Sequence, residues 1–270
     1  MNVPDTESKT FGNQTLMPVF FLGHGSPMNA IEENPFTEGW KMAVKELQKP
    51  RAILCISAHW ETKGTLVTAM EKPPTIHDFG GFPDALFAVQ YPAPGSPALA
   101  REICELIKQT EVKPDLLWGL DHGTWSVIKH MYPEADIPVV QWSLNSFQPP
   151  QYHYSLAKEL ATLRRENVLI VGSGNMVHNL RNIDWRNPEN GYEWAINANT
   201  LLKKYIAEHE HGKLINYNSL GRDIAMAVPT PEHFLPMLYI LALQQDNDNL
   251  TFFNDEVVMG SLSMTSFRIG

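Results

Sequence analysis

The chain lacks the features that mark secreted, membrane-spanning or disulfide-bonded proteins. Its 270 residues include only two cysteines. Because Cys55 and Cys104 both stand in apolar patterns, the sequence predicts no disulfide framework and favours a reducing, cytoplasmic location. No apolar run approaches the ~20 residues that cross a bilayer. Residues 1–16 lack the apolar core of a signal peptide and predict a loose tail, so we expect one domain over residues 17–270.

Basic residues are also scarce. Lys and Arg number 21 against 30 Asp and Glu, which gives a formal net charge of -9. Phosphate contacts need clustered Lys and Arg, so the composition argues against a nucleic-acid-binding protein. Neither the G-x-G-x-x-G fingerprint nor a phosphate loop followed by Lys-Ser/Thr occurs. We therefore expect a small-molecule partner rather than a nucleic acid, a nucleotide or a membrane.

Short apolar runs alternate with amphipathic stretches along the chain. The runs cover 17–22, 52–57, 65–70, 137–142 and 168–171. Their Val, Ile, Leu and Phe content and their lack of strict alternation predict strands that are buried on both faces. Helical spacing recurs between them at 36–47, 96–107, 156–163 and 195–205. This pattern predicts a single-domain α/β fold with a mostly parallel central sheet and helices on both faces, ending in an antiparallel strand over 261–269.

Histidines follow three of the predicted strands. His24 follows the first, His59 the second and His178 the last of these apolar runs. The carboxyl ends of parallel strands lie at one edge of a sheet, where open α/β proteins bind their ligands. A single such histidine would be explained by structure alone, but three at once favour a shared site. Imidazole nitrogens bind iron and zinc, so the sequence predicts a divalent metal ion at this edge.

Two further histidines extend the predicted site. Thr230 and Pro231 resemble a helix cap followed by a first-turn proline, and a helix N-terminus would keep the nearby His233 neutral and able to bind a metal ion. Asp121 and His122 begin a His-Gly turn beside aromatic residues, which is suited to lining a pocket. A helix cap with an incidental histidine explains the same residues equally well.

Eight segments, in order along the chain, together resemble the class III extradiol dioxygenases and specifically their 4,5-DOPA dioxygenase branch. They are GHGSP at 23–27, SAHW at 57–60, the loop at 74–83, YPAPGSP at 91–97, DHG at 121–123, SGNMVHNL at 173–180, PTPEHFLP at 229–236 and MGSLSM at 259–264. Each segment alone is a weak signal, whereas the ordered set is specific and spans nearly the whole chain from about residue 17. The resemblance implies an extradiol-dioxygenase-like catalytic domain over residues 17–270.

Such a domain would be a non-haem metal enzyme that opens the ring of DOPA-like catechols with O2. By the resemblance, His24, His59 and His233 match the positions of metal ligands. His178 matches a position that is either a fourth metal ligand or an acid–base group beside the metal, and we expect it to contact the metal at rest and to move protons during turnover. His122 matches a pocket histidine that bonds the substrate or oxygen, so that both His178 and His122 are candidate catalytic residues.

The resemblance also bears on the metal and on the substrate contacts. Iron(II) is expected for activity, because ground-state O2 reacts poorly with a closed-shell catechol and Zn²⁺ has no redox chemistry. Bacterial members of the family often carry zinc, so zinc is expected in the purified protein. We expect Ser26, Trp60 and His77 to contact the substrate, with Trp60 stacking on its ring and His77 reaching it from a long, turn-rich loop.

The pair Glu232 and His233 leaves alternatives open. In the wider class a carboxylate fills one ligand position, whereas the 4,5-DOPA branch uses the histidine. A zinc hydrolase would use the same histidines with Glu232 as its base, although no H-E-x-x-H motif occurs. A non-catalytic metal-binding protein is a third hypothesis. Open metal positions beside a pocket would argue against it, because a structural zinc site is closed and four-coordinate.

Overall fold

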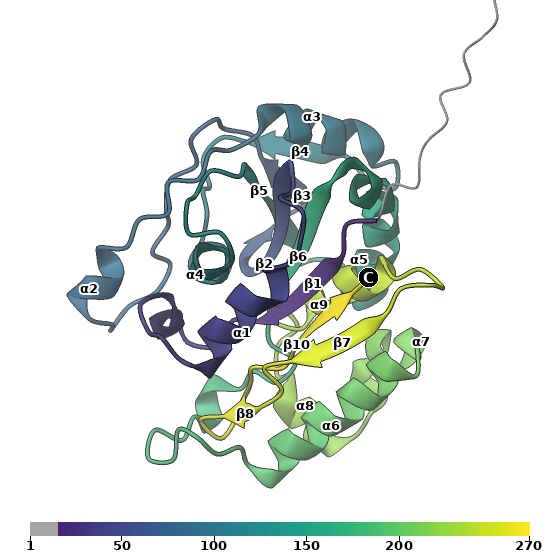
Figure 1. The fold of residues 1–270 in the computed structure, drawn as a ribbon. Helices are drawn as coiled ribbons and strands as arrows, with labels where there is room; N and C mark the ends of the chain where they lie inside the picture. Colours follow the sequence, from purple (N-terminus) through teal and green to yellow (C-terminus); the bar gives the residue numbers. More distant parts are fainter. Residues whose placement is uncertain (1–15) are drawn as a thin grey trace, which may run out of the picture.

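A mixed eight-stranded sheet forms the centre of the protein in a computed structural model that describes residues 16–270. The strand order is β4-β3-β5-β2-β6-β1-β10-β7 (Figure 1). The strands are β1 (Val19–Gly23), β2 (Ala52–Thr62), β3 (Thr65–Thr68), β4 (Val112–Asp115), β5 (Val139–Asn145), β6 (Val168–Gly174), β7 (Leu250–Phe253) and β10 (Ser266–Ile269). Apart from Leu16, the predicted loose tail lies outside the described residues.

The predicted mostly parallel sheet is confirmed in its centre. All five apolar runs form strands, and β5, β2, β6 and β1 run parallel to one another. The late antiparallel strand is also confirmed, since β10 pairs antiparallel with β1 and places Ile269 opposite Val19. β4 and β7, the two outermost strands, were not predicted from the sequence. β4 contains Pro114, which an edge strand tolerates because one side of the strand needs no backbone donor.

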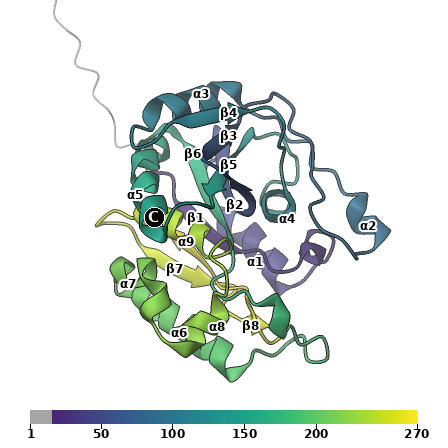
Figure 2. The same cartoon turned by 180° about the vertical axis from the view of Figure 1, so that it is seen from behind.

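Helices cover both faces of the sheet (Figure 1 and Figure 2). In β1, Val19 and Phe21 pack in one core with α3, α5 and α9, whereas Phe20 and Leu22 pack in the other core with α1 and α4. These helices are α1 (Pro35–Val44), α3 (Pro97–Leu106), α4 (His122–Met131), α5 (Pro150–Ala157) and α9 (Leu235–Ala242). The predicted layers of the α/β fold are therefore confirmed. No helix in residues 16–270 combines the length and the apolar character that a bilayer crossing needs.

The other elements are shorter or peripheral. The helices α6 (Glu193–Ala207), α7 (His211–Ile215) and α8 (Arg222–Ala227) gather beside β7 and β10 (Figure 1). α2 (Asp84–Phe87) stands in a long loop, and β8 (Val257–Val258) pairs with β9 (Leu262–Ser263). Short 3-10 helices cover Pro27–Ala30, Lys158–Glu166, Leu180–Asn182 and Tyr217–Ser219.

The predicted helix start at Thr230 is wrong. α9 begins at Leu235, and Pro236 rather than the earlier proline occupies its first turn. The Thr230 hydroxyl donates to the Glu232 carboxylate (2.8 Å) instead of accepting from a backbone N–H group. Pro236 suits the first turn, because the N–H groups there have no partner within the helix in any case. His233 therefore lies in the turn just before the helix.

A buried ion pair joins the 3-10 helix after α5 to the loop before β7. Arg164 is fully buried, and its guanidinium donates to both carboxylate oxygens of Asp248, at 2.6 and 3.0 Å. The same side chain also donates to the carbonyls of Met17 (2.9 Å) and Leu243 (2.7 Å). Every side of this charge is thus satisfied within the fold.

We expect Asp248→Asn to lower the free energy of unfolding by about 3–5 kcal/mol, because it leaves the charge of Arg164 buried and unpaired. Asp136→Asn is the matched control, since it breaks a pair with Lys49 in which both side chains are more than half exposed. It should cost less than about 1 kcal/mol. Urea unfolding measures both losses, and equal values would contradict the prediction.

Candidate metal centre

The carboxyl ends of β1 and β6 place His24. Gly23, the last residue of β1, pairs with Gly174, the last residue of β6, and the His24 N–H donates to the Gly174 carbonyl (3.1 Å). A Cβ at position 174 would lie 2.2 Å from the carbonyl oxygen of His233. The missing side chain therefore lets the turn that carries His233 reach the same edge of the sheet. There the Asn175 N–H donates to the His233 carbonyl (2.9 Å).

His59 reaches the site from within β2. The prediction that this strand ends at Ser57 is wrong, since β2 continues to Thr62. The pairing of β2 with β5 shifts between Ile56 and Glu61, and His59 lies in this irregular part. Irregular pairing changes the direction of side chains near the end of a sheet. The irregular pairing therefore lets His59 reach the carboxyl edge of the sheet from within β2, as His24 does from the end of β1.

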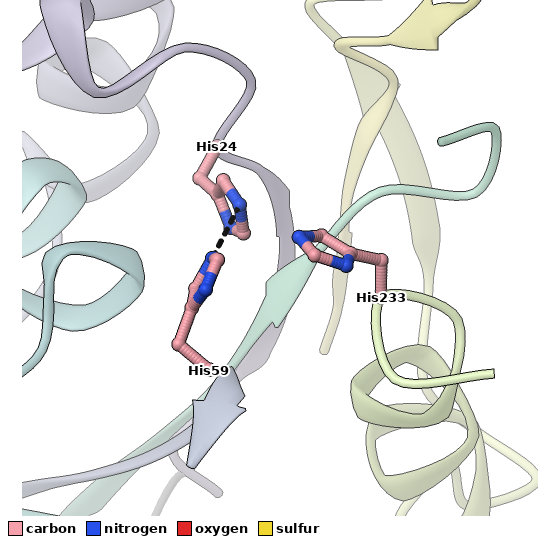
Figure 3. A group of neighbouring side chains, drawn as sticks. All are labelled: His24, His59 and His233. Carbon is pink, nitrogen blue, oxygen red and sulfur yellow. Dashed lines mark hydrogen bonds between the residues drawn. The ribbon is translucent and has the colours of Figure 1, made fainter. Parts of the chain in front are cut away.

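The rings of His24, His59 and His233 turn towards one another (Figure 3). The Nε2 atoms of His24 and His59 are 3.2 Å apart. The centroid of the His233 ring lies 5.3 Å from that of His24 and 4.9 Å from that of His59, and one ring nitrogen of each residue lies within 4.8 Å of the others. Two ligands ~2.1 Å from one ion stand roughly 3.0–3.4 Å apart in octahedral or tetrahedral geometry. The spacing of the His24 and His59 nitrogens therefore fits two ligands of one divalent metal ion, and His233 lies near enough to be a third.

Hydrogen bonds fix which nitrogen carries the proton on two of these rings. Ser173 Oγ donates to the Gly123 carbonyl (2.5 Å), so the same oxygen accepts from His24 Nδ1 (3.0 Å). His24 thus carries its proton on Nδ1 and keeps the lone pair of Nε2. The Glu232 carboxylate accepts from His233 Nδ1 (3.1 Å) and leaves His233 Nε2 free in the same way. Such partners fix the tautomer and the orientation of histidines that bind metals.

The surroundings disfavour the charged form of these imidazoles. Burial lowers the pKa of His24 and of His233 well below the ordinary value, and the neighbouring histidines lower both further. Burial, reinforced by His122, lowers the pKa of His59 to about 3 although Asp78 opposes the shift. Neutral imidazole is the form that binds Fe²⁺ and Zn²⁺. The donor atoms and their protonation therefore fit a metal ion of this class.

His178 borders the three-histidine group. Its ring stacks on that of His233, with centroids 3.4 Å apart and 7° between the planes. Among the described residues it forms a possible ligand group with Glu232 and His233 rather than with His24 and His59. Burial, assisted by a neighbouring histidine, lowers its pKa to about 4, and the carboxylate of Glu232 opposes the shift. His178 is therefore neutral at pH 7 and available for proton transfer.

His122 borders the group on the other side. It begins α4, and Asp121 caps this helix by accepting from the Thr124 N–H (3.1 Å). The same turn therefore provides both a helix cap, Asp121, and a histidine beside the three-histidine group, His122. The His122 ring centroid lies 3.9 Å from that of His59. A Cβ at Gly123 would lie 2.8 Å from the His59 ring, so the glycine lets α4 pack directly against it.

A cavity of about 350 Å³ opens beside the five histidines. Its other lining residues are largely apolar and include Ser26, Phe79, Phe82, Leu180, Ile183, Trp185, Met259 and Leu262. Of the three expected substrate contacts, Ser26 lies in this lining. Trp60 instead stacks on Trp118, with centroids 5.7 Å apart. His77 Nε2 donates to the Val89 carbonyl (2.9 Å), and its ring packs among aromatic side chains behind the cavity wall.

Asp78 was not predicted from the sequence as a site residue. This residue lines the cavity, and its carboxylate accepts from both the backbone N–H (2.8 Å) and the ring Nδ1 (2.9 Å) of His122. Hydrogen bonds from His122 keep the pKa of Asp78 below its ordinary value, although burial acts in the opposite direction and is the larger single influence. The loop was predicted to carry a substrate contact at His77. The carboxylate of the next residue was the only sign in the sequence that Asp78 could belong to the site.

Four of the cavity histidines predict an acid-sensitive metal-free protein. Burial lowers the pKa of His24, His59, His178 and His233 in the folded state. The unfolded chain therefore binds more protons below about pH 6.5, and the free energy of unfolding falls as the pH falls. A single histidine with a folded pKa of about 4, as for His178, should cost about 2 kcal/mol between pH 7 and pH 5. We therefore expect a loss of at least that size in denaturant unfolding of the metal-free protein. A stability that stays constant over this range would contradict the burial of neutral histidines.

The chain is similar to known proteins over almost its whole length. Residues 18–265 match the family described as the catalytic LigB subunit of aromatic ring-opening dioxygenase. The chain is 47% identical to the 4,5-DOPA dioxygenase extradiol of Escherichia coli (strain K12), over 96% of each chain. It is 36% identical to the protein of the same name from Beta vulgaris, over 92% of this chain and 95% of the relative. A crystal structure of an uncharacterized protein from Escherichia coli K12 matches with a TM-score of 0.80 and 42% identity, over 94% of this chain and all of that one. The chain therefore belongs to the LigB family of class III extradiol dioxygenases and is an aromatic ring-opening dioxygenase.

Proposed function

We propose that this dioxygenase opens the ring of DOPA-like catechols at an Fe(II) ion held by His24, His59 and His233. One observation carries the proposal: three neutral imidazoles converge within 4.8 Å at the wall of a cavity of about 350 Å³. The family implies a non-haem Fe(II) centre, a catechol and O2, and two relatives are named as 4,5-DOPA dioxygenases. When bound, Fe(II) supplies the redox chemistry that O2 needs to react with a closed-shell catechol.

Ring opening also needs groups that take up and return protons. We assign this role to His178 and His122, the two cavity histidines that lie outside the group of three. His178 is neutral at pH 7 because its pKa is about 4, so its ring can accept a phenolic proton and later return it. Acid–base groups in position are typically worth about 10²–10⁴-fold in rate.

The cavity walls suit an aromatic ring with polar substituents at one edge. Phe79, Phe82 and Leu262 provide apolar surface against which the ring can pack and from which water is excluded. Ser26 Oγ accepts from the Met28 N–H (3.2 Å), which leaves the hydroxyl hydrogen free to bond a substrate oxygen. We therefore keep Ser26 as a proposed substrate contact and add the two phenylalanines.

The direct test is anaerobic reconstitution with Fe(II) followed by an oxygen-uptake assay on DOPA. The expected result is consumption of one O2 for each DOPA, with a new absorption band of the ring-opened product. Tyrosine, which lacks the second hydroxyl group, is the control substrate and should consume no oxygen. Failure of a fully iron-loaded protein to consume O2 with DOPA would overturn the proposed substrate, and a panel of other catechols would then show whether another one is used.

The metal that occupies the site should decide the turnover. Zn²⁺ binds nitrogen ligands more tightly than Fe²⁺ does, so we expect protein purified in air to contain zinc and to turn over catechols poorly. Removal of zinc and anaerobic addition of Fe(II) should restore oxygen uptake. Metal analysis and rates measured on the same samples test this. Equal rates for the zinc and iron forms would contradict the need for a redox-active ion.

The zinc-hydrolase alternative is not retained. It requires Glu232 to act as a base on a metal-bound water. One oxygen of that carboxylate instead accepts from the His233 ring and from the Thr230 hydroxyl. Together with membership of a dioxygenase family, this arrangement gives Glu232 the task of orienting a ligand.

A further inference from the structure

Asp78 makes an unusual pair of contacts with one neighbour. Its Oδ1 accepts from the backbone N–H of His122 (2.8 Å), and its Oδ2 accepts from the ring Nδ1 of the same residue (2.9 Å). The side chains are only 16% and 7% exposed. A single carboxylate therefore holds both the main chain and the ring of a cavity histidine.

The loop that carries Asp78 is anchored to the same helix. The Ile76 N–H donates to the Leu120 carbonyl (2.7 Å), and Trp125 Nε1 in α4 donates to the Ile76 carbonyl (2.8 Å). Two residues later Asp78 meets the first turn of α4. These contacts fix the carboxylate relative to His122, so the pairing does not depend on a freely moving side chain.

The contacts decide which nitrogen of His122 carries the proton. A carboxylate only accepts hydrogen bonds, so a proton must stand on Nδ1, and the neutral ring then keeps a lone pair on Nε2. We propose that Asp78 is a positioning residue, which holds His122 in the tautomer whose Nε2 can accept a proton from the catechol. This inference rests on the proposed function for the identity of the proton donor. The tautomer itself does not depend on the substrate.

A purely structural role must be separated from this one, because the Asp78 bond to the His122 N–H also satisfies the first turn of α4. Asp78→Asn makes the separation. Its amide oxygen can still accept from the backbone N–H, but its NH2 group then faces Nδ1 and favours a proton on Nε2 instead. Replacing a carboxylate by an amide beside a catalytic imidazole is known to select the wrong tautomer in this way.

The first experiment reads the tautomer directly. Long-range ¹H–¹⁵N correlation spectra of the histidine-labelled zinc form give the protonated nitrogen of each ring without any turnover. The signals of His122 are those that disappear in His122→Gln. We expect a proton on Nδ1 in the wild type and on Nε2 in Asp78→Asn. An Nε2 proton in the wild type, or an unchanged tautomer in the variant, would overturn the proposal.

The second experiment follows the consequence for turnover with Fe(II) and DOPA. Asp78→Asn should lower kcat by about 10²–10⁴-fold, while iron content and the melting temperature stay close to the wild type. In a His122→Gln background the same change should have no further effect, since the group through which Asp78 acts is gone. Asp78→Glu, which keeps two acceptor oxygens, should recover part of the rate.

Other outcomes point elsewhere and count against the proposal. An equal loss of kcat in both backgrounds would mean that Asp78 acts through the fold. A loss of iron affinity would mean that it acts through His59, whose Nδ1 lies 3.5 Å from Asp78 Oδ2. Failure of the proposed function is distinguishable, because a wild type that does not oxidise DOPA still reports its tautomer in the spectra.

Discussion

Replacement of His59 by alanine is expected to abolish oxygen-dependent ring cleavage and to leave the fold intact. The ring supplies one of three nitrogens that lie within 4.8 Å of one another, and its Nε2 is 3.2 Å from that of His24. Loss of a group that merely supports a ligand already costs about 10–100-fold in metal affinity. Loss of the ligand itself should exceed this. Titration with Fe(II) or Zn(II), alongside oxygen uptake, measures both effects.

The matched control for this variant is His209→Asn. His209 is exposed beyond the end of α6 and has a positive φ of 57°, a conformation that asparagine tolerates. This variant removes a histidine and should keep the metal content and the rate of the wild type. Circular dichroism should show the same secondary structure for both variants. Full metal content in His59→Ala would contradict the assignment of the site.

The central sheet was predictable because its strands are set by local composition. The five apolar runs are long enough and rich enough in branched residues to predict buried strands without knowledge of their partners. β4 has no such signal, since it reads Val-Lys-Pro-Asp. Its strand conformation comes from pairing with β3, from Thr65 opposite Val112 to Thr68 opposite Asp115. A strand that forms only because it pairs with a neighbouring strand is a tertiary effect, which the local residue pattern of the sequence does not reveal.

The positions of the candidate histidines were predictable for the same reason, whereas the positions of Trp60 and His77 were not. Successive side chains of a strand point to opposite faces. Since β2 continues through His59 and Trp60, the two side chains diverge: His59 joins the cluster, and Trp60 stacks on Trp118. His77 and Asp78 diverge in the same way in their loop, one towards Val89 and the other towards α4. Which way each side chain of that loop points depends on its hydrogen bonds to residues distant in the sequence.

Replacement of His178 is expected to separate proton transfer from metal binding. Its ring stacks on His233 at 3.4 Å, and among the described residues it shares no possible ligand group with His24 or His59. We therefore expect His178→Ala to bind Fe(II) nearly as tightly as the wild type. Its kcat should fall by about 10²–10⁴-fold, which is about 3–5 kcal/mol of barrier.

A fourth ligand would behave in the opposite order. Metal affinity would fall first, and excess Fe(II) would restore part of the turnover of His178→Ala. His122→Gln provides the comparison. The Nδ1 of His122 donates to Asp78 (2.9 Å), so we expect this variant to lose turnover but to keep its metal content. If His178→Ala resembles His122→Gln in metal titration, both residues act on protons. If it resembles His59→Ala, His178 is a ligand and His122 is left as the group that accepts the proton of the catechol.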